Sequence, residues 1–176
     1  MQFTELKTSP DQSFLRVVDA LGDKQLTLFL MRAFELDCWV AGGFACAYAK
    51  GVRGHSMANA KDWLSSYLNK PKSDIDLFTV KNFHEVINAL SELNFRPYDQ
   101  KTLDKTAFFY DLSPKNDFEK EINVRSFWTS EGHKIQVIQS LDKTIEETVG
   151  NFDIVNAMVM INGDTEIGRA SCRERV

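Results

Sequence analysis

Two acidic residues within one short segment have the type and spacing to bind a metal ion. In the run K-P-K-S-D-I-D-L-F-T-V, residues 70–80, Asp74 and Asp76 lie two positions apart in an apolar, β-branched stretch. Residues i and i+2 of a β-strand point to the same face, so both carboxylates would lie together, opposite Ile75 and Leu77. Like charges this close raise each other's pKa unless a cation lies between them. Mg²⁺ suits such a site, because it prefers carboxylate oxygens and shares its shell with substrate phosphates.

A glycine pair upstream of these acids could hold an anion. The short apolar run at 38–41 ends in Gly42-Gly43, and small apolar residues typical of a helix start follow as far as Lys50. A strand that ends in paired glycines at a helix start brings backbone N–H groups close to an anion. Each feature alone has an ordinary explanation, a turn or a pair of solvated acids. Their order, strand, Gly-Gly, helix and acidic strand, predicts adjoining phosphate and metal sites.

These motifs together resemble a known family. V-A-G-G-F-A (40–45) followed by S-D-I-D-L-F (73–78) resembles the signature of the polymerase-beta-like nucleotidyltransferase superfamily. F-D-I-V-N-A-M (152–158) is similar to the R-D-F-T-I-N-A-M segment of tRNA nucleotidyltransferases and bacterial poly(A) polymerases. The resemblance covers about residues 36–161 and implies an α+β nucleotidyltransferase fold, with a small mixed β-sheet and helices packed on one face. It also implies two Mg²⁺ ions and transfer of a nucleoside monophosphate from an NTP to a hydroxyl group, with release of pyrophosphate.

The resemblance also assigns roles to individual residues. Gly42 and Gly43 match the glycine turn that holds the NTP phosphates, while Asp74 and Asp76 match the catalytic, metal-binding pair. Further nucleotide-binding candidates beside these motifs are Phe44, Lys72 and Ser73, and the positions matching residues near the nucleotide sugar are Asp153 and Asn156.

The chain departs from the family pattern at the third acidic position. This position falls on Gln136, in the run H-K-I-Q-V-I at 133–138. An amide ligates a metal weakly and does not neutralise its charge. Either two acids suffice, another acid contributes, or catalysis is impaired; the candidates for another acid are Asp111, Glu121 and Asp153.

Two further departures concern spacing and a lost arginine. Thirty residues separate Gly43 from Asp74, an interval longer than the family usually has, which predicts an insertion with a helix around Trp63. The arginine of the tRNA-enzyme segment is Phe152 here. The base-selecting helix and RNA-binding domains of the tRNA enzymes have no counterpart in these 176 residues, so the resemblance indicates a catalytic core and leaves open whether a further domain follows.

The elements that must position these residues follow from hydrophobic periodicity. Helical spacing over 11–36 is interrupted at Gly22-Asp23, which predicts two helices joined by a turn. Strands are expected at 38–41, 74–80, 106–112, 121–128 and 134–139, and helices at 83–93 and 142–149. A β-leaning run over 152–161 ends at Asn162-Gly163, which is a hairpin signal.

Composition restricts the class of protein. The chain has 176 residues, of which 43% are hydrophobic and 26% charged, as in one globular domain. A net charge of -4 argues against extensive coating of nucleic acid. The chain has neither a membrane-length apolar run nor a signal peptide, which predicts a cytoplasmic protein with no membrane partner. The three cysteines form no disulfide or zinc pattern.

The last eleven residues change character abruptly. The run E-I-G-R-A-S-C-R-E-R-V, residues 166–176, has no apolar periodicity and looks like the translation of a sequencing adapter. We therefore expect one domain over 1–165, with N-terminal helices at 11–36 and a core at 37–161, and a natural C-terminus that is missing.

Three hypotheses for function remain. The leading one is an active nucleotidyltransferase of small phage type that uses an NTP and a hydroxyl acceptor, which could be an RNA 3′ end, a protein or a small molecule. The second is a catalytically impaired module that binds a nucleotide or a protein without turnover. The third is the toxin of a toxin–antitoxin pair. The sequence leaves the acceptor, the preferred NTP and the oligomeric state open.

Overall fold

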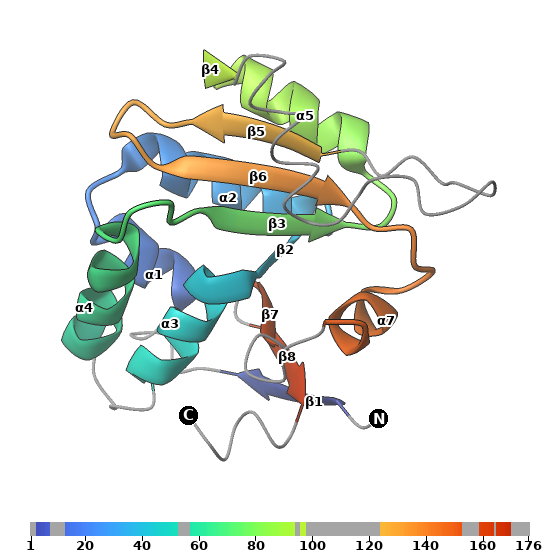
Figure 1. Cartoon of the computed structure of the whole chain (residues 1–176), viewed down its shortest axis with the longest axis horizontal. Helices are drawn as coiled ribbons and strands as arrows, with labels where there is room; N and C mark the ends of the chain where they lie inside the picture. The colour runs from blue at the N-terminus through green and yellow to red at the C-terminus, as the bar shows by residue number, and fades with distance from the viewer. Residues whose placement is uncertain are drawn as a thin grey trace.

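The computed structural model describes residues 3–7, 13–52, 57–93, 96–97, 124–152, 159–163 and 165–169. Over these ranges the chain has an α+β fold with one mixed sheet in the order β1-β8-β7-β2-β3-β6-β5-β4 (Figure 1). The strands are β1 (Phe3–Lys7), β2 (Trp39–Ala41), β3 (Ile75–Thr79), β4 (Arg96–Pro97), β5 (Val124–Trp128), β6 (Lys134–Gln139), β7 (Val159–Asn162) and β8 (Thr165–Arg169). In this part of the chain β3 pairs with β6 in parallel, and the other pairings are antiparallel.

Most of the described helices contribute to a core on one face of the sheet. The helices are α1 (Phe14–Asp19), α2 (Lys24–Glu35), α3 (Gly42–Val52), α4 (Met57–Leu68), α5 (Phe83–Glu92) and α7 (Ile145–Gly150). In the view of Figure 1, α2 lies behind β3 and β6. Buried residues of α1 to α5 form one cluster with the strands. Helix α7 packs on the opposite face, where Val149 joins Trp39 and Met160. The mixed sheet with a helical layer confirms the predicted fold class.

Alternation along β3 and β6 determines which residues face the core. Ile75 and Leu77 of β3, and Ile135 and Val137 of β6, are completely buried on the helix side. Burying a side chain of this size stabilises the fold by about 1.5–3 kcal/mol. A one-residue slip would move all four side chains out of this core and onto the opposite face of the sheet, so the register is strongly specified. The residues between them must therefore lie on the other face.

The turn between α1 and α2 anchors a distant part of the sheet. Asp23 caps α2 by accepting a hydrogen bond from the Leu26 N–H at 3.0 Å. The other carboxylate oxygen of Asp23 accepts a hydrogen bond from Thr129 Oγ1 at 2.6 Å and lies 2.7 Å from His133 Nδ1. Both of these residues belong to the β5–β6 turn. Burial alone would raise the pKa of Asp23, but these hydrogen bonds outweigh burial and lower it. The buried carboxylate thus ties α2 to the β5–β6 turn.

Most of the predicted elements that lie within the described residues are confirmed. The two N-terminal helices, the helix at α5 and the strand at β6 lie where periodicity places them. Helix α7 begins three residues later than predicted, because Thr144 is its N-cap and accepts a hydrogen bond from the Glu147 N–H. Strands β1, β4 and β8 were not predicted. The strand predicted at 106–112 lies outside the described residues.

Strand β8 overlaps the stretch that resembles an adapter translation. Residues 165–169 pair with β7 and with β1, so four residues of the 166–176 stretch belong to a strand. The adapter origin and the domain limits stay predictions. No helix in the described ranges is long and apolar enough to cross a membrane.

Candidate active site

Asp74 and Asp76 lie where the alternation of β3 predicts. Asp76 is within the strand and only 8% exposed, and Asp74 directly precedes the strand and is half-buried. Their intervening neighbour Ile75 is completely buried in the core on the helix side. The local sequence therefore directs acidic side chains to the sheet face away from α1 and α2.

The glycine turn lies directly against Asp76. Residue Ala41 at the end of β2 pairs with Asp76 across the antiparallel β2–β3 ladder. Gly42 follows with a φ of +71°, and α3 starts at Gly42 itself, where the sequence predicted a turn before the helix. A Cβ on Gly42 would lie 2.6 Å from Asp76 Oδ2, closer than real Cβ atoms approach another atom. The absence of a side chain at Gly42 therefore makes room for the carboxylate, and the two predicted motifs meet.

Tyr67 joins the second glycine to the acidic strand. A Cβ on Gly43 would lie 2.5 Å from the Tyr67 ring atom Cε2. The Tyr67 hydroxyl donates a hydrogen bond of 2.7 Å to the backbone carbonyl of Asp74. Burial raises the pKa of Tyr67, and the charges of Asp74 and Asp76 raise it further, so the phenol stays protonated and donates. Sequence patterns do not single out Tyr67, whose only signal is an aromatic side chain near the end of the predicted insertion helix.

The electrostatics of the site favour a cation. Burial raises the pKa of Asp74, and the nearby ammonium group of Lys134 opposes that rise. Lys134 is the first residue of β6, and the pairing of Ile75 with Ile135 places it level with Asp74. A positive ion bound beside Asp74 and Asp76 would stabilise their charged forms further.

The position beside Asp76 holds an amide, as the sequence predicted. Gln136 pairs with Asp76 across the parallel β3–β6 ladder, and Ser126 of β5 pairs with Gln136 on its other side. Gln136 is 2% exposed, and its Nε2 lies 3.4 Å from Ser126 Oγ as a hydrogen-bond donor. Within the described ranges no group of three or more His, Cys, Asp or Glu side chains could hold a metal. The alternative acids Asp111, Glu121 and Asp153 lie outside the described residues.

The other predicted site residues lie in different environments. The Phe44 ring is completely buried in the core, with its centroid 5.8 Å from that of Phe14. The Ser73 hydroxyl donates to the Leu68 carbonyl at 3.0 Å and so holds the turn after α4. Lys72 is exposed and has a φ of +63° in that same turn. Asp153 and Asn156 lie outside the described residues, so the sugar contacts stay predictions.

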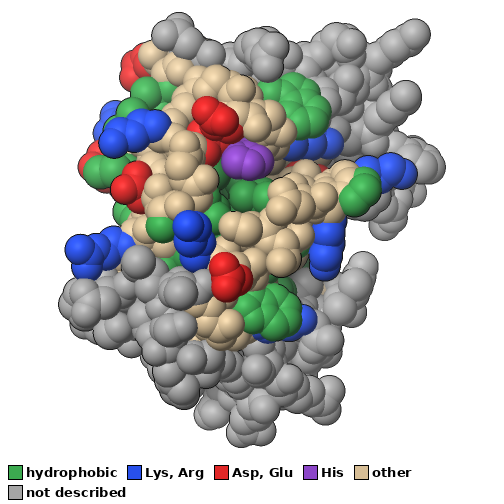
Figure 2. All heavy atoms as spheres, turned by 90° about the vertical axis from the view of Figure 1, so that its left-hand side faces the viewer, with side chains coloured by type: hydrophobic (Ala, Val, Ile, Leu, Met, Phe, Trp, Pro, Cys, Tyr) green, Lys and Arg blue, Asp and Glu red, His purple; other side chains and the backbone are tan. Residues whose placement is uncertain are grey.

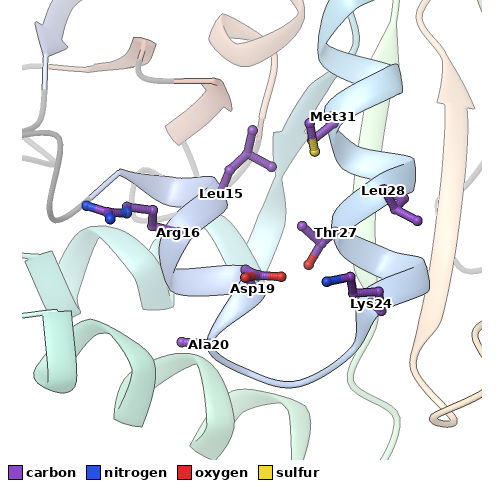
Figure 3. A pocket seen from close by; sticks show the side chains of 8 residues that line it. All are labelled: Leu15, Arg16, Asp19, Ala20, Lys24, Thr27, Leu28 and Met31. Atoms are coloured by element: carbon purple, nitrogen blue, oxygen red, sulfur yellow. The ribbon is translucent and has the colours of Figure 1, made fainter.

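A large surface hollow lies away from these residues. It has a volume of about 750 Å³ and lies between α1 and α2, on the helix layer opposite the Asp76 face. Leu15 and Met31 line one end, and Asp19 and Lys24 point toward one another at the other end (Figure 3). None of the predicted site residues lines it. The hollow is therefore separate from the candidate active site.

Comparison with solved structures gives a likeness in fold. The chain is similar to the CCA-adding enzyme of Thermotoga maritima, solved in complex with tRNA_CCA, with a TM-score of 0.51 and 16% sequence identity. The match covers 99% of this chain and 34% of that one, so the chain spans about a third of the enzyme's length. At this identity the similarity defines the fold class, which is nucleotidyltransferase-like.

Comparison with family models identifies the family itself. The model of the Gabija anti-defense 2 family matches residues 10–171, nearly the whole chain. The chain therefore belongs to the Gabija anti-defense 2 family. No curated protein matches its sequence.

Proposed function

We propose that this chain is a Mg²⁺-dependent nucleotidyltransferase, which transfers a nucleoside monophosphate from an NTP to a hydroxyl acceptor and releases pyrophosphate. The observation that carries the proposal is the contact between the glycine turn and the acidic pair. A Cβ on Gly42 would lie 2.6 Å from Asp76 Oδ2, so the glycine leaves room for the carboxylate and a phosphate held at this turn would lie next to the metal-binding acids. Substrate phosphates and metal ions occupy adjoining positions in phosphoryl transfer.

The described side chains suit hard cations. Asp74 and Asp76 would hold the Mg²⁺ ions through carboxylate oxygens, with Gln136 as a weak neutral ligand at most. Binding would lower the pKa of Asp74, because a positive charge opposes the effect of burial. Bound there, Mg²⁺ would make the acceptor hydroxyl more acidic and stabilise the departing pyrophosphate.

The backbone and Lys134 would supply the remaining contacts. The first N–H groups of α3, which starts at Gly42, have no partners within the helix and are suited to phosphate oxygens. Lys134 would hold Asp74 in its charged form. Described Lys and Arg side chains on one face of the molecule are scattered among acidic and apolar ones (Figure 2). The net charge of -4 favours a small acceptor or a protein over a long nucleic acid.

The family name suggests the biological setting. In a family described as anti-defense against Gabija, nucleotidyl transfer would act against that defence. The acceptor would then be a hydroxyl group of a molecule on which the defence depends.

A second candidate function is nucleotide binding without turnover. The amide of Gln136 beside Asp76, where the family pattern has an acid, favours it. A site with two carboxylates would still bind an NTP with Mg²⁺, but it would stabilise the transition state less.

Labelled substrates distinguish the two functions. The chain is incubated with Mg²⁺ and each NTP labelled at the α-phosphate, with and without an extract of cells that carry the Gabija system. Transfer of label to a new product, reduced at least about 100-fold in an Asp74→Asn, Asp76→Asn variant, is expected for the enzyme. Mg²⁺-dependent NTP binding with no labelled product would support the binding module. Transfer that persists in the variant would refute the assignment of the acidic pair.

A further inference from the structure

The segment between the two motifs brings its own side chain into the site. Thirty residues separate Gly43 from Asp74, and α4 occupies part of this interval. Helix α4 packs against α3, and Tyr67 near its end lies between the glycine turn and the start of β3. An insertion of this kind need not contact the site at all, so the contact itself requires an explanation.

Tyr67 contacts both halves of the site through different atoms. Its hydroxyl holds the backbone carbonyl of Asp74 at 2.7 Å. Its ring fills the space beside Gly43, where a Cβ would come within 2.5 Å of Cε2, and its centroid lies 6.0 Å from that of Phe44. A rigid aromatic ring with one end hydrogen-bonded fixes the separation of the groups at its two ends.

The turn that follows Tyr67 is itself held by hydrogen bonds. The Lys70 N–H donates to the Tyr67 carbonyl at 3.1 Å, and the Ser73 N–H donates to the Lys70 carbonyl at 3.3 Å. The Ser73 hydroxyl bonds the Leu68 carbonyl. Asp74 is the single residue between Ser73, where this turn ends, and Ile75, where β3 begins. Movement of Tyr67 would therefore be transmitted to Asp74.

We propose that Tyr67 is a positioning residue, which sets the distance between the phosphate-binding glycine turn and the metal-binding acids. This role rests on the proposed function, since a fixed distance between phosphate and metal sites matters for transfer. Tyr67 would touch neither the metal nor the reacting atoms. It would act through the Asp74 carbonyl and through the backbone at Gly43.

A matched pair of variants tests the role of the hydroxyl. Tyr67→Phe keeps the ring and removes the bond to Asp74, whereas Tyr48→Phe removes a hydroxyl from a buried tyrosine of α3 that packs edge-on against Phe14. Amide hydrogen exchange is measured over residues 38–48 and 69–78. We expect Tyr67→Phe to speed exchange at 73–76 about 5-fold, as for the loss of one hydrogen bond, and to weaken stabilisation by MgCl₂. Tyr48→Phe should leave both unchanged.

A second pair of variants tests the ring. Gly43→Ala places a methyl group against the Tyr67 ring, and it should speed exchange of 73–76 as the hydroxyl leaves Asp74. In a Tyr67→Ala background the same substitution should have a smaller effect on this exchange, because the ring that the methyl group would displace is absent. Equal effects of Gly43→Ala in both backgrounds, or unchanged exchange in Tyr67→Phe, would refute the positioning role.

These readouts separate failure of this inference from failure of the proposed function. Hydrogen exchange requires neither substrate nor turnover. Faster exchange in Tyr67→Phe supports the contact even if the unchanged chain transfers no label. The absence of label transfer would overturn only the transferase assignment. If the chain transfers label, Tyr67→Phe should lower kcat about 5-fold and raise the Mg²⁺ concentration for half-maximal rate. A loss of kcat in proportion to the folded fraction, with that concentration unchanged, would indicate a merely structural role and refute positioning.

Discussion

Replacing Gly42 with alanine tests whether this glycine exists to make room for the Asp76 carboxylate. The substitution imposes two separate costs. A residue with a Cβ at a φ of +71° is strained, typically by about 1–2 kcal/mol. The new methyl group would also lie 2.6 Å from Asp76 Oδ2, and overpacking of this kind costs about 1–3 kcal/mol. Together these effects should lower the free energy of unfolding by about 2–5 kcal/mol.

The chain provides a control that carries only the first cost. Gly132, in the β5–β6 turn, has a φ of +87°, and a Cβ there would meet nothing within 4 Å. Gly132→Ala should therefore lower the free energy of unfolding by about 1–2 kcal/mol. The entropy that alanine removes from the unfolded chain is the same for both variants, so it cancels from the difference.

Urea unfolding and the label-transfer assay together read out this comparison. We expect Gly42→Ala to be less stable than Gly132→Ala by about 1–3 kcal/mol. We also expect it to lose more than about 10-fold in transfer, because displacement of the Asp76 carboxylate by even a fraction of an ångström would disturb the proposed metal site. Gly132→Ala should retain transfer. Equal stabilities of the two variants, with transfer retained in both, would refute the idea that Gly42 accommodates the carboxylate.

Three further predictions concern the core and the buried polar groups. Asp23→Asn should lower the free energy of unfolding by about 1–3 kcal/mol at pH 7, through weaker bonding to His133. Because the pKa of Asp23 is lowered by folding, its contribution is present above its unfolded pKa and disappears as the pH falls through the folded value. Urea melts at pH 7 and at pH 3 should therefore show a smaller difference at pH 3. Gln136→Asp adds a carboxylate that is almost completely buried, so this variant should unfold at a lower temperature than the unchanged chain without Mg²⁺. When Mg²⁺ is added, the unfolding temperature of the variant should rise by more than that of the unchanged chain. Equal rises of the two in thermal-shift measurements would contradict a metal beside this position. Leu30→Ala should lower the free energy of unfolding by about 2–5 kcal/mol, because Leu30 is completely buried. Leu28, on the same helix, is 46% exposed, so Leu28→Ala should lower it by less than about 1 kcal/mol. Similar losses for the two variants in urea melts would contradict the observed orientation of α2.

Local patterns were enough to predict much of the fold. The period-2 alternation of β3 placed Asp76 and Ile75 on opposite faces, and the helical periodicity of α5 matched its observed bounds within one residue. Strand β1 escaped prediction because its partner β8 is distant in sequence, and β4 escaped it because β4 is only two residues long. Pairing of this kind depends on long-range contacts that no local window contains.

The candidate site was predictable only in part, for a related reason. The Gly-Gly pair and the two acids carry recognisable types at recognisable positions, so they were found from the sequence. Tyr67 carries no such signal, since an aromatic residue in an amphipathic helix is more often part of the core. Its place against Gly43 and the Asp74 carbonyl follows from how α4 packs on α3.

The groups that make up the candidate site are present in the sequence at recognisable spacings. Two carboxylates on one face of a strand and a glycine pair at a helix start follow from residue type and strand period, and the resemblance to the nucleotidyltransferase family implies that Gln136 stands where that family has a third acid. That these groups meet follows from the tertiary structure. The antiparallel β2–β3 ladder places Ala41 opposite Asp76, and the parallel β3–β6 ladder places Gln136 beside Asp76. Distances across a sheet depend on strand order and register, which are set by burial of the whole core and are not encoded at any one position.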